Sequence, residues 1–284
     1  MWPAVNSSAG NIRKNTITYL YQSQSKQHFN MQKKLSTAVI AGTVICTLLF
    51  GCAFQSRTQS VVKILSYNIF HGEDPYRKQP NLDSVAALIN ELKPDLVAFQ
   101  EMDSMTGRSA KIYGERINYI QLLAEKTNMH GYFGKAMDYD GGGYGEGALT
   151  RKKAKTRTHL LPMPSGGEPR AAIEVVYPVA GHKNLVFAAT HLCHEFMPNK
   201  IAQTQKLNEL FANQGQPAIL AGDLNFTPEE EPYQVLAGSW TDAAVTHGNA
   251  GATFPADAPK IRIDYFWLNK QSSWRVVDFR TLPH

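Results

Sequence analysis

Short runs of apolar, β-prone residues recur along this chain, and several of them stop at polar residues that are suited to chemistry. The stretches at these points are Ser66-Tyr67-Asn68, Gln100-Glu101, Thr190-His191-Leu192, Gly222-Asp223-Leu224-Asn225 and Ile263-Asp264-Tyr265. Side chains at strand ends project from a rigid scaffold, which is where layered α/β enzymes carry their catalytic groups. Together these groups would form an oxygen-rich site that suits a hard divalent cation and a phosphate ester.

From Val61 onward, strand-like and helix-like segments alternate without repeats or low-complexity stretches. Strands are expected at 61–69, 95–100, 132–137, 147–150, 156–161, 171–177, 185–192, 218–221, 262–268 and 274–281. Helices are expected at 81–92, 117–126 and 199–213, and a polar surface loop at 103–115. Many strands and few helices over one uninterrupted segment predict a single α/β domain with two packed sheets and helices outside them.

The positive net charge of +5 is concentrated at the start of the chain. Residues 1–51 contain five basic residues and no acidic one, and residues 52–284 hold 24 basic and 24 acidic residues. Nonspecific binding of DNA depends on Lys and Arg contacts to phosphates. The formal neutrality of 52–284 therefore weakens, without excluding, a nucleic-acid partner.

An apolar segment follows the basic pair Lys33-Lys34. Leu35 to Phe50 is a run of 16 uncharged residues, which is short for a membrane span and typical of a secretion signal. It ends in Leu-Phe-Gly-Cys52, which resembles the lipobox of bacterial lipoproteins, where the Cys is acylated and becomes the mature N-terminus. We expect an exported protein, anchored through lipid on Cys52 to the periplasmic or cell-surface side of a bacterial membrane. A plain signal-anchor helix is the alternative.

This signal divides the chain into four parts. Residues 31–51 are the expected signal peptide, 52–60 a polar tether, 61–284 the folded domain, and 1–30 a spurious or disordered extension without a structural role. Cys193 would be the one cysteine of the mature fold, so no internal disulfide is expected there.

The motifs SYN, LVAFQE, YGEGALTR, THL, GDLN and IRIDYFW follow one another in an order that resembles the endonuclease/exonuclease/phosphatase superfamily, over nearly all of 61–284. Each motif alone is a weak signal, but several in the same order are specific. The resemblance implies a DNase I-like, four-layer α/β sandwich with two mostly antiparallel sheets. It also implies hydrolysis of phosphodiester or phosphomonoester bonds with Mg²⁺, for which Mn²⁺ or Ca²⁺ would be substitutes.

The resemblance also assigns roles to individual residues. It implies that Glu101 binds the metal together with Asn68, and that Asp223 readies the attacking water. Asn225 would bind phosphate oxygen, and His191 would bind phosphate or act as an acid in stabilising the transition state. Because Asp223 and Asn225 are two residues apart, their side chains would point the same way on an extended segment, and an Asp-Leu-Asn turn is the alternative.

Asp264 resembles the family's Asp that orients a catalytic His belonging to a closing Ser-Asp-His motif. No Ser-Asp-His and no Asp-His pair occurs in this sequence. We therefore expect the chain to lack the C-terminal end of the family domain and to be weakly active.

Several alternatives stay open from the sequence. A small phosphodiester, a phospholipid head group or a sugar or inositol phosphate is favoured as substrate, and a secreted DNase I-like endonuclease is the competing function. An inactive, surface-anchored binding protein of the same fold is the alternative of another class. A calcineurin-like phosphoesterase would need Asp-x-His and Gly-Asn-His clusters, which are absent. We expect a monomer.

Other residues are weaker candidates. Arg108, Tyr144 and Arg151 would contact phosphate oxygens or be solvated. His71 and its neighbours would line the site or form a polar turn. A zinc site made of His191, Cys193 and His194 fits no common ligand spacing, and Cys193 is expected to be a buried apolar residue.

Overall fold

The computed structural model describes residues 16–23, 60–74 and 76–282. The expected signal peptide at 31–51, Cys52 and the tether as far as residue 59 lie outside these residues. Within them, none of the helices combines the length and the apolar character that a membrane crossing needs.

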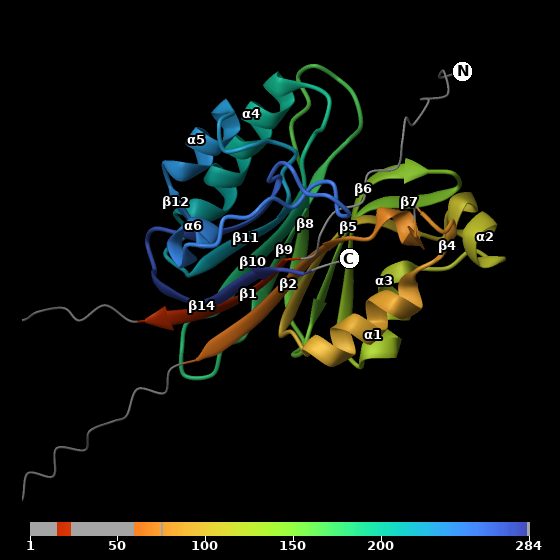
Figure 1. Cartoon of the computed structure of the whole chain (residues 1–284), viewed down its shortest axis with the longest axis horizontal. Helices are drawn as coiled ribbons and strands as arrows, with labels where there is room; N and C mark the ends of the chain where they lie inside the picture. Colours follow the sequence, from red (N-terminus) through yellow and green to blue (C-terminus); the bar gives the residue numbers. More distant parts are fainter. Residues whose placement is uncertain (1–15, 24–59, 75, 283–284) are drawn as a thin grey trace, which may run out of the picture.

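Two six-stranded sheets pack against each other in the described part of the chain (Figure 1). The first sheet has the order β14 (Ser273–Thr281), β1 (Thr16–Ser23), β2 (Val61–Asn68), β5 (Leu96–Ser104), β7 (Gly142–Thr150), β6 (His130–Tyr139). The second has the order β12 (Trp240–Asp242), β13 (Asp264–Asn269), β11 (Ala218–Asp223), β10 (Leu185–His191), β9 (Ala171–Tyr177), β8 (Lys155–Leu160). Among these strands, β2 runs parallel to β5 and β10 parallel to β11, and the other neighbours are antiparallel. The expected mostly antiparallel arrangement is confirmed.

Helices cover both outer faces of this sandwich (Figure 1). The elements on the side of the first sheet are α1 (Leu82–Leu92), α2 (Gly107–Tyr113) and α3 (Tyr119–Thr127), with the 3₁₀ turn η1 (Phe70–Gly72) and the short hairpin β3 (Glu73–Asp74) and β4 (Gln79–Pro80). Those following the strands of the second sheet are α4 (Met197–Leu207), a π-helical turn η2 (Asn208–Ala212), α5 (Glu231–Ala237) and α6 (Ala243–His247).

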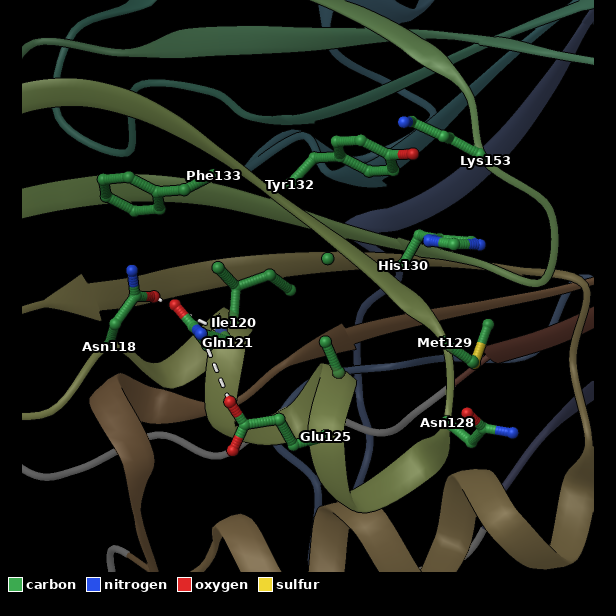
Figure 2. A pocket seen from close by; sticks show the side chains of 12 residues that line it. Asn118, Ile120, Gln121, Glu125, Asn128, Met129, His130, Tyr132, Phe133 and Lys153 are labelled. Atoms are coloured by element: carbon green, nitrogen blue, oxygen red, sulfur yellow. Dashed lines mark hydrogen bonds between the residues drawn. The ribbon is translucent and has the colours of Figure 1, made fainter.

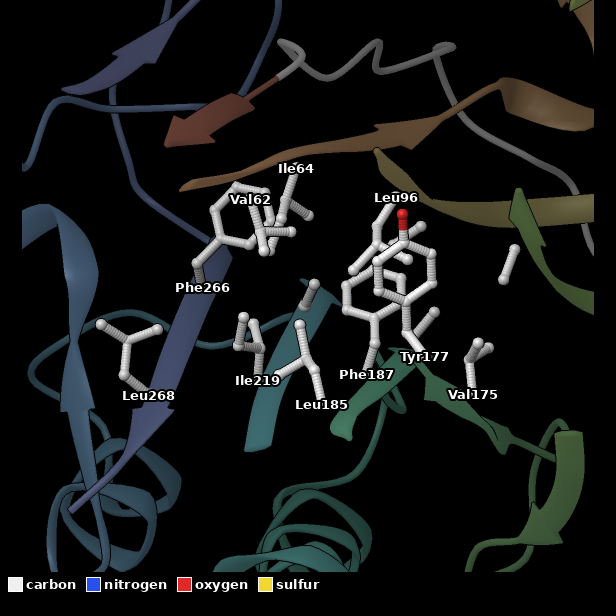
Figure 3. Close-up of a cluster of buried hydrophobic side chains, with 14 of the residues drawn as sticks. Val62, Ile64, Leu96, Val175, Tyr177, Leu185, Phe187, Ile219, Phe266 and Leu268 are labelled. Carbon is white, nitrogen blue, oxygen red and sulfur yellow. The ribbon is translucent and has the colours of Figure 1, made fainter. Parts of the chain in front are cut away.

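The strands have two apolar faces because both faces of each sheet are covered. In β5, Leu96 and Ala98 point into the cluster between the sheets, where they meet Phe187 of the second sheet (Figure 3). Val97 and Phe99 point the other way, into the cluster formed with α1 and α3. This alternation gives the helix, sheet, sheet, helix layering, so the expected four-layer α/β sandwich is confirmed.

Three of the described helices, α2, α5 and α6, were not expected from the sequence, and α2 falls where a loop was predicted. Residues 103–115 were predicted to form a loop, but α2 occupies 107–113. Thr106 caps it, since its side chain accepts a hydrogen bond from the backbone N–H of Ser109, and Gly114 ends it in a left-handed conformation with φ 83°. These cap signals are enough for a short polar helix that has little apolar periodicity.

The strand β1 corrects the expectation that residues 1–30 have no structural role. Thr16–Ser23 pairs antiparallel with β2 on one side and with β14 on the other. Its sequence, TITYLYQS, is rich in β-branched and aromatic residues, which favour strands. In this position β1 covers the edge of β2 and joins β14, which has no other partner among the described strands, to the first sheet.

Candidate active site

The ends of the two parallel strand pairs meet across the sandwich. Asn68 lies opposite Gln100 at the end of the β2–β5 pair, and His191 lies opposite Asp223 at the end of the β10–β11 pair. The side chain of Asn68 contacts both Glu101 and Asp223. Four of the residues predicted from the sequence therefore form one cluster.

The amide of Asn68 joins the two sheets. Its Nδ2 lies 2.9 Å from Oε1 of Glu101 and 3.2 Å from Oδ2 of Asp223, and its Oδ1 accepts a hydrogen bond from the backbone N–H of Phe70 at 3.0 Å. An amide NH₂ group donates hydrogen bonds and offers no lone pair to a cation. In this orientation Asn68 aligns two carboxylates, and binding a metal through its oxygen would require the side chain to turn.

A β-bulge presents Glu101 to the cluster. The register of β5 and β7 shifts between Phe99 and Met102, so that Gln100 and Glu101 together face Glu146. Glu101 has a φ of 62°, a left-handed conformation that is uncommon for a residue with a side chain. Backbone strain of this kind is concentrated at functional sites, where the surrounding structure maintains it. The strand was expected to end at 100; instead, it continues to Ser104 through the bulge.

Gly222 brings the second sheet close to the first. Its φ is 146°, and a Cβ at this position would overlap the carbonyl oxygen of Thr190 and lie 3.2 Å from Nε2 of Gln100. A larger residue would therefore push apart the parallel strands that carry His191 and Asp223.

His191 lies between the carboxylate of Asp223 and the guanidinium of Arg170. Its Nε2 is 3.2 Å from Oδ2 of Asp223, and its Nδ1 is 2.9 Å from Nη1 of Arg170. The guanidinium also contacts Nδ1 of His194 at 3.2 Å and Oε1 of Glu168 at 3.1 Å. His191 and Arg170 are each 3% exposed, so the contact between them is buried, whereas the side chains of His194 and Glu168 are 52% and 32% exposed.

Asn225 does not follow the geometry expected from its spacing. Asp223 and Asn225 were predicted to point the same way on an extended segment, but β11 ends at Asp223 and Asn225 has a φ of 54°. The backbone N–H of Asn225 donates to Oδ1 of Asp223 at 3.2 Å, and its Nδ2 donates to the carbonyl of Leu192 at 2.9 Å. The segment is a turn because the Asp side chain captures the backbone two residues on.

Asp264 lies directly opposite Asp223 in the β11–β13 ladder and is 3% exposed. Its backbone N–H donates to Oγ1 of Thr253 at 3.2 Å. The structure thus places Asp264 at the same end of the second sheet as Asp223, while its predicted role in orienting a histidine stays a prediction.

Two buried groups near Glu101 have pKa values well above their ordinary ones. Burial raises the pKa of the Glu146 carboxyl well above its ordinary value; Arg170 opposes this shift, whereas the charges of Glu101 and Glu168 add to it. Burial also raises the pKa of Tyr144, again with a contribution from Glu101. Ionisable groups with such shifts are common at functional sites.

The weaker candidates from the sequence lie in different surroundings. Arg108 forms a bidentate pair with Asp103, at 2.9 and 2.7 Å, and its guanidinium lies 5.0 Å from the ring centre of Tyr144. Arg151 instead donates to the carbonyl of Pro94. His71 lies beside the cluster, with Nδ1 3.6 Å from Oε2 of Glu101.

The zinc alternative is not supported. Nδ1 of His191 and Nδ1 of His194 both face the guanidinium of Arg170, and the Sγ of Cys193 accepts a hydrogen bond from the backbone N–H of Phe196. No group of three or more His, Cys, Asp or Glu side chains in the described ranges is arranged to hold a metal ion. Cys193 is buried, as expected.

Two hollows of the surface lie apart from this cluster. One, of about 550 Å³, lies between α3 and the beginning of β6 and is bordered by Gln121, Glu125 and Tyr132 (Figure 2). The other, of about 390 Å³, is bordered by Tyr233, Lys260 and other residues of the loops near α5 and α6. Neither lining includes a residue of the Asn68 cluster.

Arg170 and Glu146 were missed by reasoning from the sequence. Each left a signal there, because each is a charged residue next to or inside a segment that is otherwise apolar or glycine-rich, EPRAAIEVV and YGEGALT. Charged residues are rarely buried without a partner or a function.

Comparison with known proteins supports the assignment of the fold. Residues 65–282 match the model of the Endonuclease/Exonuclease/phosphatase family. The uncharacterized protein YbhP of Escherichia coli K12 is 23% identical over 221 residues, which cover 74% of this chain and 86% of that protein.

Solved structures share the architecture. An endonuclease/exonuclease/phosphatase from Beutenbergia cavernae superimposes with a TM-score of 0.62 at 21% identity, over 74% of this chain and 64% of that one. A mannosyl-6-phosphatase from Bacteroides thetaiotaomicron gives a TM-score of 0.56 at 15% identity, over 73% of this chain and 85% of that one.

Proposed function

The chain belongs to the endonuclease/exonuclease/phosphatase family, a family of phosphoester hydrolases, and we propose that it is a Mg²⁺-dependent phosphoesterase whose active site is the Asn68 cluster. The single observation that carries this proposal is the contact of one amide, that of Asn68, with Glu101 of the first sheet and Asp223 of the second. Asn68 and Asp223 are 155 residues apart in the sequence, and their contact brings two carboxylates to one amide, which the packing of the core alone does not require.

The donors present suit Mg²⁺. Glu101 is a carboxylate with a partly exposed side chain, and Asp223 is a second carboxylate held near it. Mg²⁺ is usually held by one or two carboxylates together with waters and substrate phosphate, so it does not need a cage of three protein ligands. We propose Glu101 as the metal ligand, with Asn68 joining it when its amide turns.

The residues of the chain divide the remaining work. A bound Mg²⁺ supplies Lewis-acid stabilisation of charge on the phosphate oxygens. Asp223 receives hydrogen bonds or contacts from Asn68, His191 and the backbone of Asn225, which hold its carboxylate where it can orient and deprotonate an attacking water. Asn225 would then bind phosphate oxygens, while His191 holds the Asp223 carboxylate in place.

The substrate we favour is a small phosphate ester, such as a phospholipid head group or a sugar or inositol phosphate. The balanced charge of residues 52–284 gives no general attraction for long DNA. A secreted endonuclease is the competing possibility within the same chemistry.

The test is an assay of the purified chain on bis-p-nitrophenyl phosphate, p-nitrophenyl phosphate, sphingomyelin, inositol phosphates, mannose 6-phosphate and plasmid DNA. We expect hydrolysis with Mg²⁺, slower or equal rates with Mn²⁺ or Ca²⁺, and loss of activity with EDTA. Turnover that is indifferent to chelation would overturn the metal mechanism. Preferential cleavage of plasmid DNA would establish the nuclease, and binding of a phosphate ester without turnover would establish an inactive binding protein.

We also propose that the protein is exported and carries lipid on Cys52. The support is the basic pair and apolar run that precede Cys52 in the sequence. Labelled palmitate should be incorporated by the wild type and not by Cys52→Ala. A wild-type protein that incorporates no label and does not fractionate with membranes would contradict the lipid anchor.

A further inference from the structure

Arg170 is a deeply buried cation at the cluster that the proposed mechanism does not use. It is 3% exposed and precedes β9, with its guanidinium directed at two histidines. A buried cation is costly unless it is paired, and Glu168 is its nearest ionic partner at 3.1 Å. The cost of burying Arg170 therefore indicates that its positive charge has a role at this position.

The guanidinium determines which nitrogen of His191 carries the ring proton. Arginine has five N–H donors and no acceptor, so Nδ1 of His191 must accept the hydrogen bond from Nη1 at 2.9 Å. The proton of the neutral ring then lies on Nε2, which is the nitrogen 3.2 Å from Oδ2 of Asp223. The N–H group of Arg170 thus points at His191, and the N–H group of His191 points at the carboxylate of Asp223.

The same contact disfavours the imidazolium form of His191 and opposes the Asp223 carboxylate, which lies 3.2 Å from Nε2 and favours that form. A second ring proton, on Nδ1, would point at an N–H group of Arg170 at hydrogen-bonding distance, and the two positive charges would repel each other. His191 would then be a fixed neutral donor, in contrast to the acid that the sequence resemblance allowed.

We propose that Arg170 is a positioning residue that holds His191 neutral, with its proton on Nε2 and directed at Asp223. The proposal rests on the proposed function only for its catalytic consequence, since the position of the proton can be measured without substrate. His194 is the second acceptor of the same guanidinium, so it helps to keep Arg170 in place.

The test is nuclear magnetic resonance of the full chain labelled with [¹⁵N]histidine at neutral pH, with the signals of His191 assigned by their loss in His191→Gln. We expect a protonated Nε2 and an unprotonated Nδ1 in the wild type. In Arg170→Met the proton should redistribute toward Nδ1 or occupy both nitrogens, and Arg170→Lys, which offers fewer donors, should be intermediate.

Activity on bis-p-nitrophenyl phosphate provides a second readout. We expect kcat to fall about 10-fold to 100-fold in Arg170→Met, with little change in KM, because an orienting group is lost and no substrate contact is removed. The matched control is Arg151→Met, which removes an arginine whose Nε donates to the carbonyl of Pro94 and should leave both readouts unchanged.

A wild-type His191 that carries its proton on Nδ1, or on both nitrogens, would overturn the proposal even if no variant folded. An unchanged proton position in folded Arg170→Met would also overturn it, and Arg170 would then have only a structural role. Absence of phosphoesterase activity in the wild type would defeat the proposed function alone, because the resonance result would still stand or fall by itself.

Discussion

The two sheets support their halves of the cluster in different ways. In the second sheet, His191 and Asp223 end regular parallel strands, their side chains are 4% and 0% exposed, and contacts with Arg170 extend the network inward. In the first sheet, Glu101 sits on left-handed backbone in a bulge and its side chain is 17% exposed.

This difference matches the different catalytic role that each half of the cluster would have. A group that orients water must be held rigidly, and burial with several hydrogen bonds does so. A ligand for a hydrated cation must remain within reach of solvent, so its direction is set by the backbone instead of by burial. The site therefore combines a rigid half in the second sheet with an accessible half in the first.

The largest effect should come from the rigid half. Asp223→Asn keeps the shape of the side chain but can place an NH₂ group against donors of Asn68 and His191. We expect kcat/KM on bis-p-nitrophenyl phosphate to fall about 10³-fold at saturating Mg²⁺. The variant's thermal midpoint serves as a control for folding, and a folded variant within 10-fold of wild type would remove Asp223 from the mechanism.

The accessible half should show a smaller loss that depends on metal. Glu101→Gln removes the charge of the proposed ligand, so we expect about a 10²-fold loss of kcat and a higher Mg²⁺ concentration for half-maximal activity. Glu174→Gln is the matched control, because Glu174 pairs with His159 at 2.8 Å outside the cluster. An unchanged Mg²⁺ titration in Glu101→Gln would contradict the assignment.

The first sheet should also depend on β1. Tyr19→Pro removes a backbone donor from a strand that pairs with Lys63 of β2 and Asp278 of β14. We expect the free energy of unfolding in urea to fall by about 2 to 3 kcal/mol. If it does not change, β1 contributes nothing to the stability of the first sheet.

The smallest effect concerns the buried acid opposite the bulge. Because burial raises the folded-state pKa of Glu146 above its unfolded value near 4.5, stability associated with this group is complete below that value and is lost as the pH rises. Glu146→Gln should remove this loss, raising the free energy of unfolding at pH 8 and changing it little at pH 4. Urea unfolding of wild type and Glu146→Gln at both pH values, in metal-free buffer, measures this change in the free energy of unfolding. An equal change at pH 4 and pH 8 would show that the pKa of Glu146 is not raised in the fold.

Much of the cluster could be found from the sequence because its members follow runs of apolar residues. Asn68, Glu101, His191 and Asp223 are each marked by the strand before them, and the structure brings them together. Arg170 could not be placed in this way, since its partner His191 lies 21 residues away and nothing local reveals the contact.

The errors have a common origin. The bulge at Glu101 depends on the pairing of β5 with β7, and the role of β1 depends on two strands distant in the sequence. The turn at Asn225 was the exception, because the Asp-Leu-Asn sequence permits it locally and the extended alternative was preferred.

By itself the sequence determined most of the strands, the apolar faces of the layers and the polar residues that follow the apolar runs, because these follow from side-chain periodicity over a few neighbouring residues. Only the packing of one sheet on the other decided that Asn68 spans Glu101 and Asp223, and that Arg170 directs His191. Those contacts form between distant segments, where the cost of burying polar groups is offset by the partners that tertiary structure alone supplies.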